Sequence, residues 1–565
     1  MKSVAGLLPE WESLSLAEQV AQMVVVRASG YLFDHQIQYP DWEPPSAVLQ
    51  HWVQELGVGG VILLGGSAGE LALRSQQLQD WAKIPLLIAA DIEEGVGQRF
   101  SGATWFPPPM AIGAVFRKDA SLALEYAEQM GGIIASEALA IGINWVLAPV
   151  VDVNNNPSNP VINVRAFGET PEEVSQLASA FIRGAKAYPV LTTAKHFPGH
   201  GDTAVDSHLE LPVLPHSPAR LAELELLPFQ EAISPSPSAS DTASGVDAVM
   251  SAHLLIPAWD AERPATLSQP ILTQLLRQQL GFEGLIVTDA LVMGAIANRY
   301  GANEAPVLAV EAGADILLMP VDPAGAIQAV CDAVAQGRIS EARIRASVER
   351  IWTAKRRVQQ STAEQLETPA IASGVQKPER SPFPPHLLQL AQPHALATAA
   401  NIVRESLVVH GEIPLLPSQG NLRNLIVVDD TLNCDFLDRQ APAVALPKQH
   451  GYQLQLLDPH TTLIPGWVFY HKSGLNAQPT LLQLFIRGNP FRGSAGLTPL
   501  AQDLFKKLLE NAELQALVIY GSPYLLEQFL PHLPPNIPCV FSYGQMPAAQ
   551  AIALEVLFGS PTLSI

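Results

Sequence analysis

The chain has few of the residues that fix a disulfide framework or a membrane span. It contains 3 Cys among 565 residues, and their wide spacing excludes both a disulfide framework and a cysteine metal knuckle. No apolar run approaches the roughly 18 residues that a transmembrane helix needs. The N-terminal residues also contain no apolar core of signal-peptide length. We therefore expect a cytoplasmic protein with no membrane partner.

Positive charge and aromatic residues are scarce as well. Lys and Arg number 33 against 54 Asp and Glu, so the formal net charge is −21 at pH 7. A surface of this sign repels phosphate backbones, which argues against nucleic-acid binding. Aromatic residues make up 7% of the chain while Pro numbers 48, a balance that favours a loop-rich α/β protein over a helical bundle. The hydrophobic share of 48% excludes wholesale disorder.

Short apolar runs recur along the N-terminal part of the chain. The runs are continuous rather than alternating, which is typical of strands buried on both faces of a parallel sheet. They cover residues 23–26, 61–64, 86–89, 145–148, 190–193, 248–251, 285–288 and 316–319. We expect helices between them, including helices at 121–139, 171–187 and 271–280. This alternation predicts a (β/α)8 TIM-type barrel, with an open doubly wound sheet as the alternative.

A second domain is expected beyond the barrel. Residues 359–393 are rich in polar residues and Pro, which predicts an interdomain linker. Strand-like runs then follow, with helices between them, at 425–428, 481–486, 516–519 and 539–541. We therefore divide the chain into a barrel domain at 1–358, a linker at 359–393 and a smaller α/β domain at 394–565.

Polar side chains stand at the ends of several predicted barrel strands. In a parallel barrel all strands end at the same rim, and the catalytic sites of this fold are built there. The pattern therefore predicts a catalytic site at that rim. The strand-end residues are Asp91, Asp152, Lys195, His196, His253 and Asp289.

The segment from Lys195 to His208 is the densest in chemically active side chains. It holds three His, two Asp and one Lys in a glycine-punctuated loop after a buried strand. Asp206 and His208 lie two residues apart, so an extended loop points their side chains the same way. The carboxylate can then orient the imidazole for acid–base chemistry. The alternatives are a solvated loop and a zinc site of His196, His200 and His208, although the Pro and Gly residues disfavour the helix such a site needs.

Three further segments offer candidate side chains. Asp289 directly follows an apolar strand, where an acid is costly unless it faces a polar rim; it suits a nucleophile, a base or a helix N-cap. Asp91 and Arg99 bracket a segment that could clamp sugar hydroxyls or form a surface loop with an internal salt bridge. Arg165 could bind a ligand or bridge to a loop acid.

Taken together, these segments resemble the bacterial β-N-acetylglucosaminidases of glycoside hydrolase family 3. The segment from Lys195 to His208 is the most specific match, because it follows that group's pattern Lys-His-Phe-Pro-Gly-His-Gly…Asp-Ser-His. Residues 264–268 and the stretch that ends at Asp289 are similar as well. The resemblance covers residues 12–350, and the second domain loosely resembles the α/β sandwich that some members append.

The resemblance implies roles for individual residues. Asp289 would be the nucleophile, and His208 the general acid–base, oriented by Asp206. Two positions depart from the family pattern: Glu94 replaces the first Gly of Asp-x-Glu-Gly-Gly, and Ala290 stands where Asp often follows the nucleophile. The sugar in the −1 subsite would be held by Asp91, Arg99, Arg165, Lys195 and His196, with Asn163 and His253 as weaker candidates.

The implied activity is retaining hydrolysis of terminal non-reducing β-linked N-acetylglucosamine, without a metal or another cofactor. N-acetylglucosaminyl glycosides, including muropeptides of peptidoglycan turnover and recycling, would be the substrates. Phosphorolysis is an alternative, because a histidine that has given up its proton is neutral and does not repel phosphate. β-Glucosidase activity is another. A sugar-binding protein on a degenerate barrel is the non-enzymatic alternative, which the joint presence of Asp206, His208 and Asp289 argues against.

Overall fold

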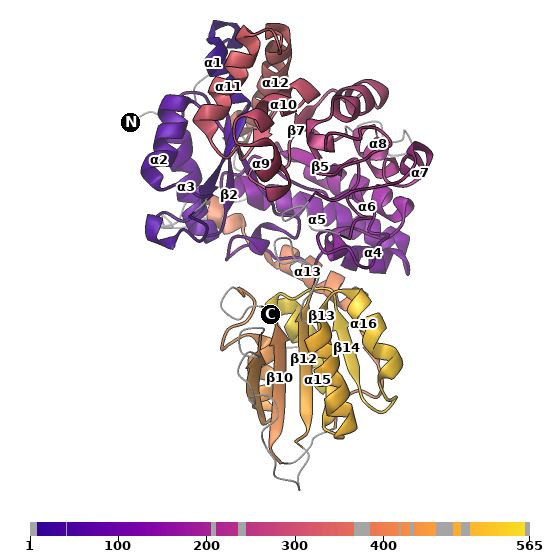
Figure 1. Ribbon diagram of the computed structural model, residues 1–565. Helices are drawn as coiled ribbons and strands as arrows, with labels where there is room; N and C mark the ends of the chain where they lie inside the picture. The colour runs from indigo at the N-terminus through magenta and orange to yellow at the C-terminus, as the bar shows by residue number, and fades with distance from the viewer. Residues whose placement is uncertain are drawn as a thin grey trace.

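The computed structural model describes residues 8–40, 42–204, 211–234, 245–366, 385–416, 420–429, 434–458, 478–487 and 498–559. Within these ranges the chain forms two α/β domains, with helix α13 (Pro393–Ser406) lying between them (Figure 1). Asp206 and His208 lie outside the described residues.

The first domain is built on a parallel sheet whose described strands follow the order β7-β6-β5-β4-β3-β2-β1-β8. A parallel bridge between Val287 and Ile316 joins the two ends of this order and closes the barrel. Each predicted run overlaps one strand, so the TIM-type barrel is confirmed and the open doubly wound alternative is wrong. The strands are β1 (Val24–Ser29), β2 (Gly60–Leu64), β3 (Leu87–Ala90), β4 (Trp145–Val146), β5 (Leu191–Phe197), β6 (Ala248–Ser251), β7 (Leu285–Val287) and β8 (Leu317–Leu318).

Helices surround this sheet and explain why its strands are continuously apolar. The barrel interior covers one face of each strand and the helices cover the other, so nearly every strand residue is buried. The three predicted helices are present as α5 (Ala120–Ala140), α6 (Pro171–Ala185) and η7 (Pro270–Gln279). The further α-helices described in this domain are α1 (Leu16–Gln22), α2 (Ser46–His51), α3 (Ala68–Trp81), α4 (Met110–Phe116), α7 (Pro218–Glu223), α8 (Leu227–Ile233), α9 (Gly294–Tyr300), α10 (Glu304–Ala312), α11 (Pro323–Ala335) and α12 (Glu341–Leu366).

The second domain contains a mixed sheet in the order β11-β10-β12-β13-β14-β9. All neighbouring pairs are parallel except β9, which is antiparallel to β14 at the edge. The four predicted runs correspond to β10, β12, β13 and β14. The sequence did not predict β9 or β11, because β9 is a three-residue edge strand and the polar Gln453 and Gln455 interrupt the apolar run of β11. The strands are β9 (Val408–His410), β10 (Leu422–Val428), β11 (Tyr452–Leu457), β12 (Thr480–Ile486), β13 (Leu514–Gly521) and β14 (Cys539–Ser542).

Helices cover both faces of the second sheet, which makes this domain an α/β sandwich. Helix α15 (Thr498–Glu510) packs against β12 and β13, whereas α14 (Pro442–Gln449) and α17 (Pro547–Phe558) pack against each other and against β11 and β14, respectively. Alternate residues of β10 belong to different apolar clusters, as the two-residue period of a strand requires. Helix α16 (Pro523–Phe529) follows β13.

Helix α13 connects the two domains by packing against α4 and α5 of the barrel and against α17 of the sandwich. The division at residues 358 and 393 stays a prediction. Within the described ranges, no helix is long and apolar enough to cross a membrane.

Candidate active site

The carboxyl ends of β3 and β5 bring together acidic and basic side chains. The ammonium of Lys195, near the end of β5, lies 2.7 Å from Asp91 Oδ1 and also pairs with Glu93. The Lys195 side chain is only 1% exposed. Burial alone would lower the pKa of Lys195, but Asp91 and Glu93 outweigh it and raise that pKa. Lys195 is therefore a charged donor at the rim, held between two carboxylates.

Arg165 completes this cluster from the loop that follows β4. Its Nη2 lies 2.7 Å from Glu93 Oε1, and its Nε lies 2.8 Å from Glu93 Oε2. Burial opposes ionisation of Glu93, yet Arg165 and Lys195 hold its pKa well below the usual range. The bridge from Arg165 to a loop acid, one of the two alternatives for this residue, is present. The four charges of the cluster balance, which leaves donors and acceptors suited to neutral hydroxyl groups.

A buried carboxylate orients the histidine next to this cluster. His196 Nδ1 donates to Asp152 Oδ2 over 2.7 Å, and the main-chain N–H groups of His196 and His200 donate to Asp152 Oδ1. Burial alone would raise the pKa of Asp152, but these neighbours lower it. The hydrogen bond at Nδ1 orients the ring of His196 so that Nε2 points toward the charged cluster, 3.5 Å from Arg165 Nη2.

His200 is held as a neutral ring behind His196. Burial lowers the pKa of His200 to about 4, although Asp152 and, more weakly, Asp289 favour its charged form. Its Nδ1 lies 2.8 Å from Thr203 Oγ1. Asp289 follows β7, two strands from β5 in the sheet order, so both belong to the same carboxyl-end rim of the barrel.

Asp289 stands immediately after Thr288, which follows β7, and its Oδ1 accepts a 2.7 Å hydrogen bond from the Ala290 N–H. The N-cap of the next helix, α9, is Met293, so Asp289 does not cap it. His253 supports this turn, because its Nε2 donates to the Ala290 carbonyl over 3.0 Å. The ring of His253 is fully buried. His253 therefore acts on the main chain beside the candidate nucleophile.

The remaining predicted residues shape loops or lie outside the described ranges. Arg99 is exposed, and its Nε donates to the Asp91 carbonyl over 3.2 Å. Asn163 has a left-handed main chain (φ 45°), and its side-chain Oδ1 accepts from the Val164 N–H. The roles predicted for Asp206 and His208 stay predictions, because these residues are not among those described.

Sequence reasoning missed Glu93 and Asp152 as parts of the site. Asp152 was noted as a strand-end acid, and Glu93 lies inside the quoted segment after β3, but neither had an assigned role. The available signal for Glu93 was its match to the family pattern Asp-x-Glu. Its partner Arg165 is 72 residues away, so local patterns could not reveal the pairing.

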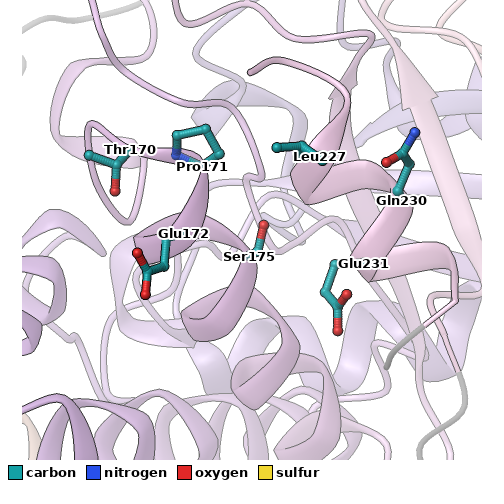
Figure 2. Close-up of a pocket in the computed structure, with 7 residues that line it drawn as sticks. All are labelled: Thr170, Pro171, Glu172, Ser175, Leu227, Gln230 and Glu231. Carbon is teal, nitrogen blue, oxygen red and sulfur yellow. The ribbon is translucent and has the colours of Figure 1, made fainter. Parts of the chain in front are cut away.

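A surface hollow lies elsewhere, between the start of α6 and helix α8 (Figure 2). It belongs to the outer helical layer and contains none of the predicted site residues. We assign it no role. Its lining residues are Thr170, Pro171, Glu172, Ser175, Leu227, Gln230 and Glu231.

Both domains match known family models. Residues 15–354 match the glycosyl hydrolase family 3 N-terminal domain, and residues 416–559 match the bacterial glycosyl hydrolase family 3 C-terminal domain. The chain therefore belongs to glycoside hydrolase family 3.

Several named proteins are similar to it. Beta-hexosaminidase A of Pseudoalteromonas piscicida is 36% identical over 350 residues, or 57% of this chain. The match spans 56% of that relative, little more than half its length. The beta-hexosaminidase of Tolumonas auensis is 38% identical over 273 residues, which is 48% of this chain and 78% of that protein.

Solved structures agree with the two-domain fold. A family 3 beta-N-acetylglucosaminidase from a Paenibacillus species superposes with a TM-score of 0.72 at 31% identity, over 98% of both chains. A beta-glucoside phosphorylase superposes with a TM-score of 0.77 at 22% identity, over 98% of this chain and 93% of that one. The phosphorylase shares the fold of this chain.

Proposed function

We propose that this protein is a retaining glycosidase that releases terminal, non-reducing β-linked N-acetylglucosamine. The observation that carries this proposal is the position of Asp289 just after β7, at the same carboxyl-end rim of the barrel where Lys195, Arg165 and their carboxylate partners form a charge-balanced cluster. Such a cluster offers both donors and acceptors to sugar hydroxyls. The family membership and the likeness to a beta-N-acetylglucosaminidase over nearly the whole chain support this sugar.

The proposed reaction has two steps and one covalent intermediate. A carboxylate oxygen of Asp289 attacks the anomeric carbon while the bond from that carbon to the leaving oxygen breaks, and the general acid protonates the leaving oxygen. Water then attacks the same carbon and gives its proton to the base, and Asp289 departs. We assign both proton transfers to His208, oriented by Asp206, because a histidine near neutral pH serves in either direction.

The natural substrates that we propose are N-acetylglucosaminyl glycosides, including muropeptides released in peptidoglycan turnover. Phosphorolysis of the same intermediate is the second candidate. It is favoured by the use of a histidine, since the ring is neutral after the first step and a phosphate dianion would meet no charged acid–base carboxylate.

The test is turnover of para-nitrophenyl β-N-acetylglucosaminide by the purified protein, with the β-glucoside and β-xyloside in parallel, each with and without phosphate. We expect preference for the acetamido sugar and release of the free sugar. Release of the sugar 1-phosphate would replace the hydrolase with a phosphorylase. Preference for another sugar, or no turnover, would overturn the proposed activity.

The nucleophile is tested separately. Asp289→Ala should lower kcat by roughly 10⁴-fold or more, because no covalent intermediate can form. Asp80→Ala, which removes an exposed acid on α3, is the matched control and should leave kcat unchanged. Appreciable turnover by Asp289→Ala protein that is free of wild-type enzyme would refute the assignment.

A further inference from the structure

Glu94, where this chain departs from the family pattern, is bound by the second domain. Arg487, directly after β12, places Nη2 2.6 Å from Glu94 Oε1 and Nη1 3.3 Å from Oε2. The Glu94 side chain is 2% exposed and that of Arg487 is 19% exposed. A two-point contact between a guanidinium and a carboxylate fixes geometry as well as charge.

An apolar contact lies beside this ion pair. The indole Nε1 of Trp105 donates to Glu94 Oε2 over 3.3 Å. The Trp105 side chain packs against a cluster that includes Val403 of α13, Ala549 of α17 and Met546, the N-cap of α17. Because both charged side chains are largely buried, the attraction between Glu94 and Arg487 is stronger than at an open surface.

The second domain also contacts the loop that carries Arg165. Tyr524 of α16 donates its hydroxyl proton to Glu169 Oε1 over 2.6 Å and accepts from Asn154 Nδ2 over 2.8 Å. Asn154 Oδ1 in turn accepts the main-chain N–H of Asn163, two residues before Arg165. The second domain thus holds both loops that supply the charged cluster.

The consequence for the site follows from chain connectivity. Glu94 adjoins Glu93, which pairs with Lys195 and Arg165. Without Arg487, Glu94 would be a buried carboxylate next to another one, and the loop would have to move to expose or neutralise it. Any such movement displaces Glu93 and its two partners.

We propose that Arg487 is a positioning residue of the sugar subsite, contributed by the second domain. It fixes the Glu93–Glu94 turn, and through that turn it fixes the two cations, Lys195 and Arg165, that hold the sugar. This inference rests on the proposed function. A Gly at position 94, as in the family pattern, would offer Arg487 no carboxylate. The ion pair between the two domains therefore depends on the presence of Glu94 in this chain.

The experiment compares Arg487→Ala, Arg487→Lys, Glu94→Gly and the Arg487→Ala/Glu94→Gly double variant. KM and kcat are measured with para-nitrophenyl β-N-acetylglucosaminide, and the Kd of N-acetylglucosamine is measured by calorimetry. Arg487→Ala should raise both KM and Kd about tenfold, with a smaller change in kcat. Arg487→Lys should recover most of the affinity. In the Glu94→Gly background, Arg487→Ala should change Kd by less than about twofold, because the pair no longer exists.

Gln129→Ala is the matched control. Gln129 Oε1 of α5 lies 3.0 Å from Thr398 Oγ1 of α13, so this variant also removes a hydrogen bond near the domain boundary, but one on the outer helices. Its KM and Kd should stay at the wild-type values. If Gln129→Ala and Arg487→Ala raised KM and Kd equally, the loss of affinity would reflect weaker packing between the two domains in general. That result would overturn the positioning role of Arg487. An equal effect of Arg487→Ala in both Glu94 backgrounds would do the same.

The two proposals fail in distinguishable ways. Wild-type protein that binds N-acetylglucosamine without turning over any of the glycosides would refute the proposed function and leave the affinity test valid. An unchanged Kd in folded Arg487→Ala would refute the positioning role alone. If Arg487→Ala does not fold, Arg487→Gln and Arg487→Lys take its place, and wild-type affinity in both would overturn the inference. Wild-type protein with neither turnover nor sugar affinity would refute both.

Discussion

Arg165 and Glu93 lie 72 residues apart in the chain and meet through two hydrogen bonds of 2.7 and 2.8 Å. These two hydrogen bonds connect the loop after β4 to the loop after β3. Because Glu93 also pairs with Lys195 of β5, one carboxylate connects three neighbouring strand ends of the barrel. The charged cluster of Asp91, Glu93, Arg165 and Lys195 is therefore a connected unit, and disturbing one member should disturb the others.

Replacing the carboxylate at the centre of this unit tests the connection. Glu93→Gln leaves two buried cations with one carboxylate, so the free energy of unfolding should fall by about 3 kcal/mol. The kcat/KM for the aryl N-acetylglucosaminide should fall as well. Urea unfolding and steady-state kinetics measure the two effects. Glu128→Gln weakens the more exposed pair with Arg183 and should cost less than about 1 kcal/mol. Similar stability losses in both variants would contradict this account of Glu93.

The Asp152 carboxylate should matter through His196. In Asp152→Asn the ring loses the charged acceptor that orients it, and kcat/KM should fall by roughly 10- to 100-fold. The double variant Asp152→Asn/His196→Asn should be little worse than His196→Asn alone, because both act on one interaction. Multiplicative losses in the double variant would show that Asp152 acts independently of His196.

The buried ring of His200 predicts a specific pH dependence of stability. Its pKa is about 4 in the folded protein, against 6.5 for the free side chain. Below pH 6.5 the unfolded chain binds a proton that the folded protein does not, so stability is complete above this pH and falls as the pH approaches 4. The loss should be on the order of 3 kcal/mol in total.

Urea unfolding at pH 7, 6 and 5 measures this loss, with His200→Asn as the comparison. Glu93 does not obscure the window: its pKa lies below the usual 4.5, so the stability it adds is lost only as the pH falls below that value. The free energy of unfolding should fall less steeply in His200→Asn than in the wild type between pH 7 and 5. Parallel curves for the two proteins would exclude His200 as the source.

Much of the fold could be predicted from local patterns. The barrel strands are buried on both faces, so each consists mainly of consecutive apolar residues. The predicted apolar runs overlap strands β1 to β8. The second sheet was predicted less completely: β11 is partly exposed along its length, and β9 is a three-residue edge strand. Neither presents the continuous run that marks a central strand.

The site could be predicted only in part for a related reason. Asp91, Lys195 and Asp289 were predicted from their positions at the ends of apolar strands, because a parallel barrel carries all its strand ends to one rim. The ion pairs and hydrogen bonds of Glu93, Asp152 and Arg487 were not predicted, because each depends on a partner in another loop or domain. Arg487 and Glu94 are 393 residues apart.

The sequence by itself determined which segments become buried strands and which polar residues reach the rim. Both follow from local chemistry, since apolar runs leave water and strand direction fixes the end at which a polar residue emerges. The tertiary structure alone decided which charges pair. An ion pair forms wherever folding brings two side chains within a few ångströms, and a buried carboxylate such as Glu94 requires a partner there whatever its distance along the chain.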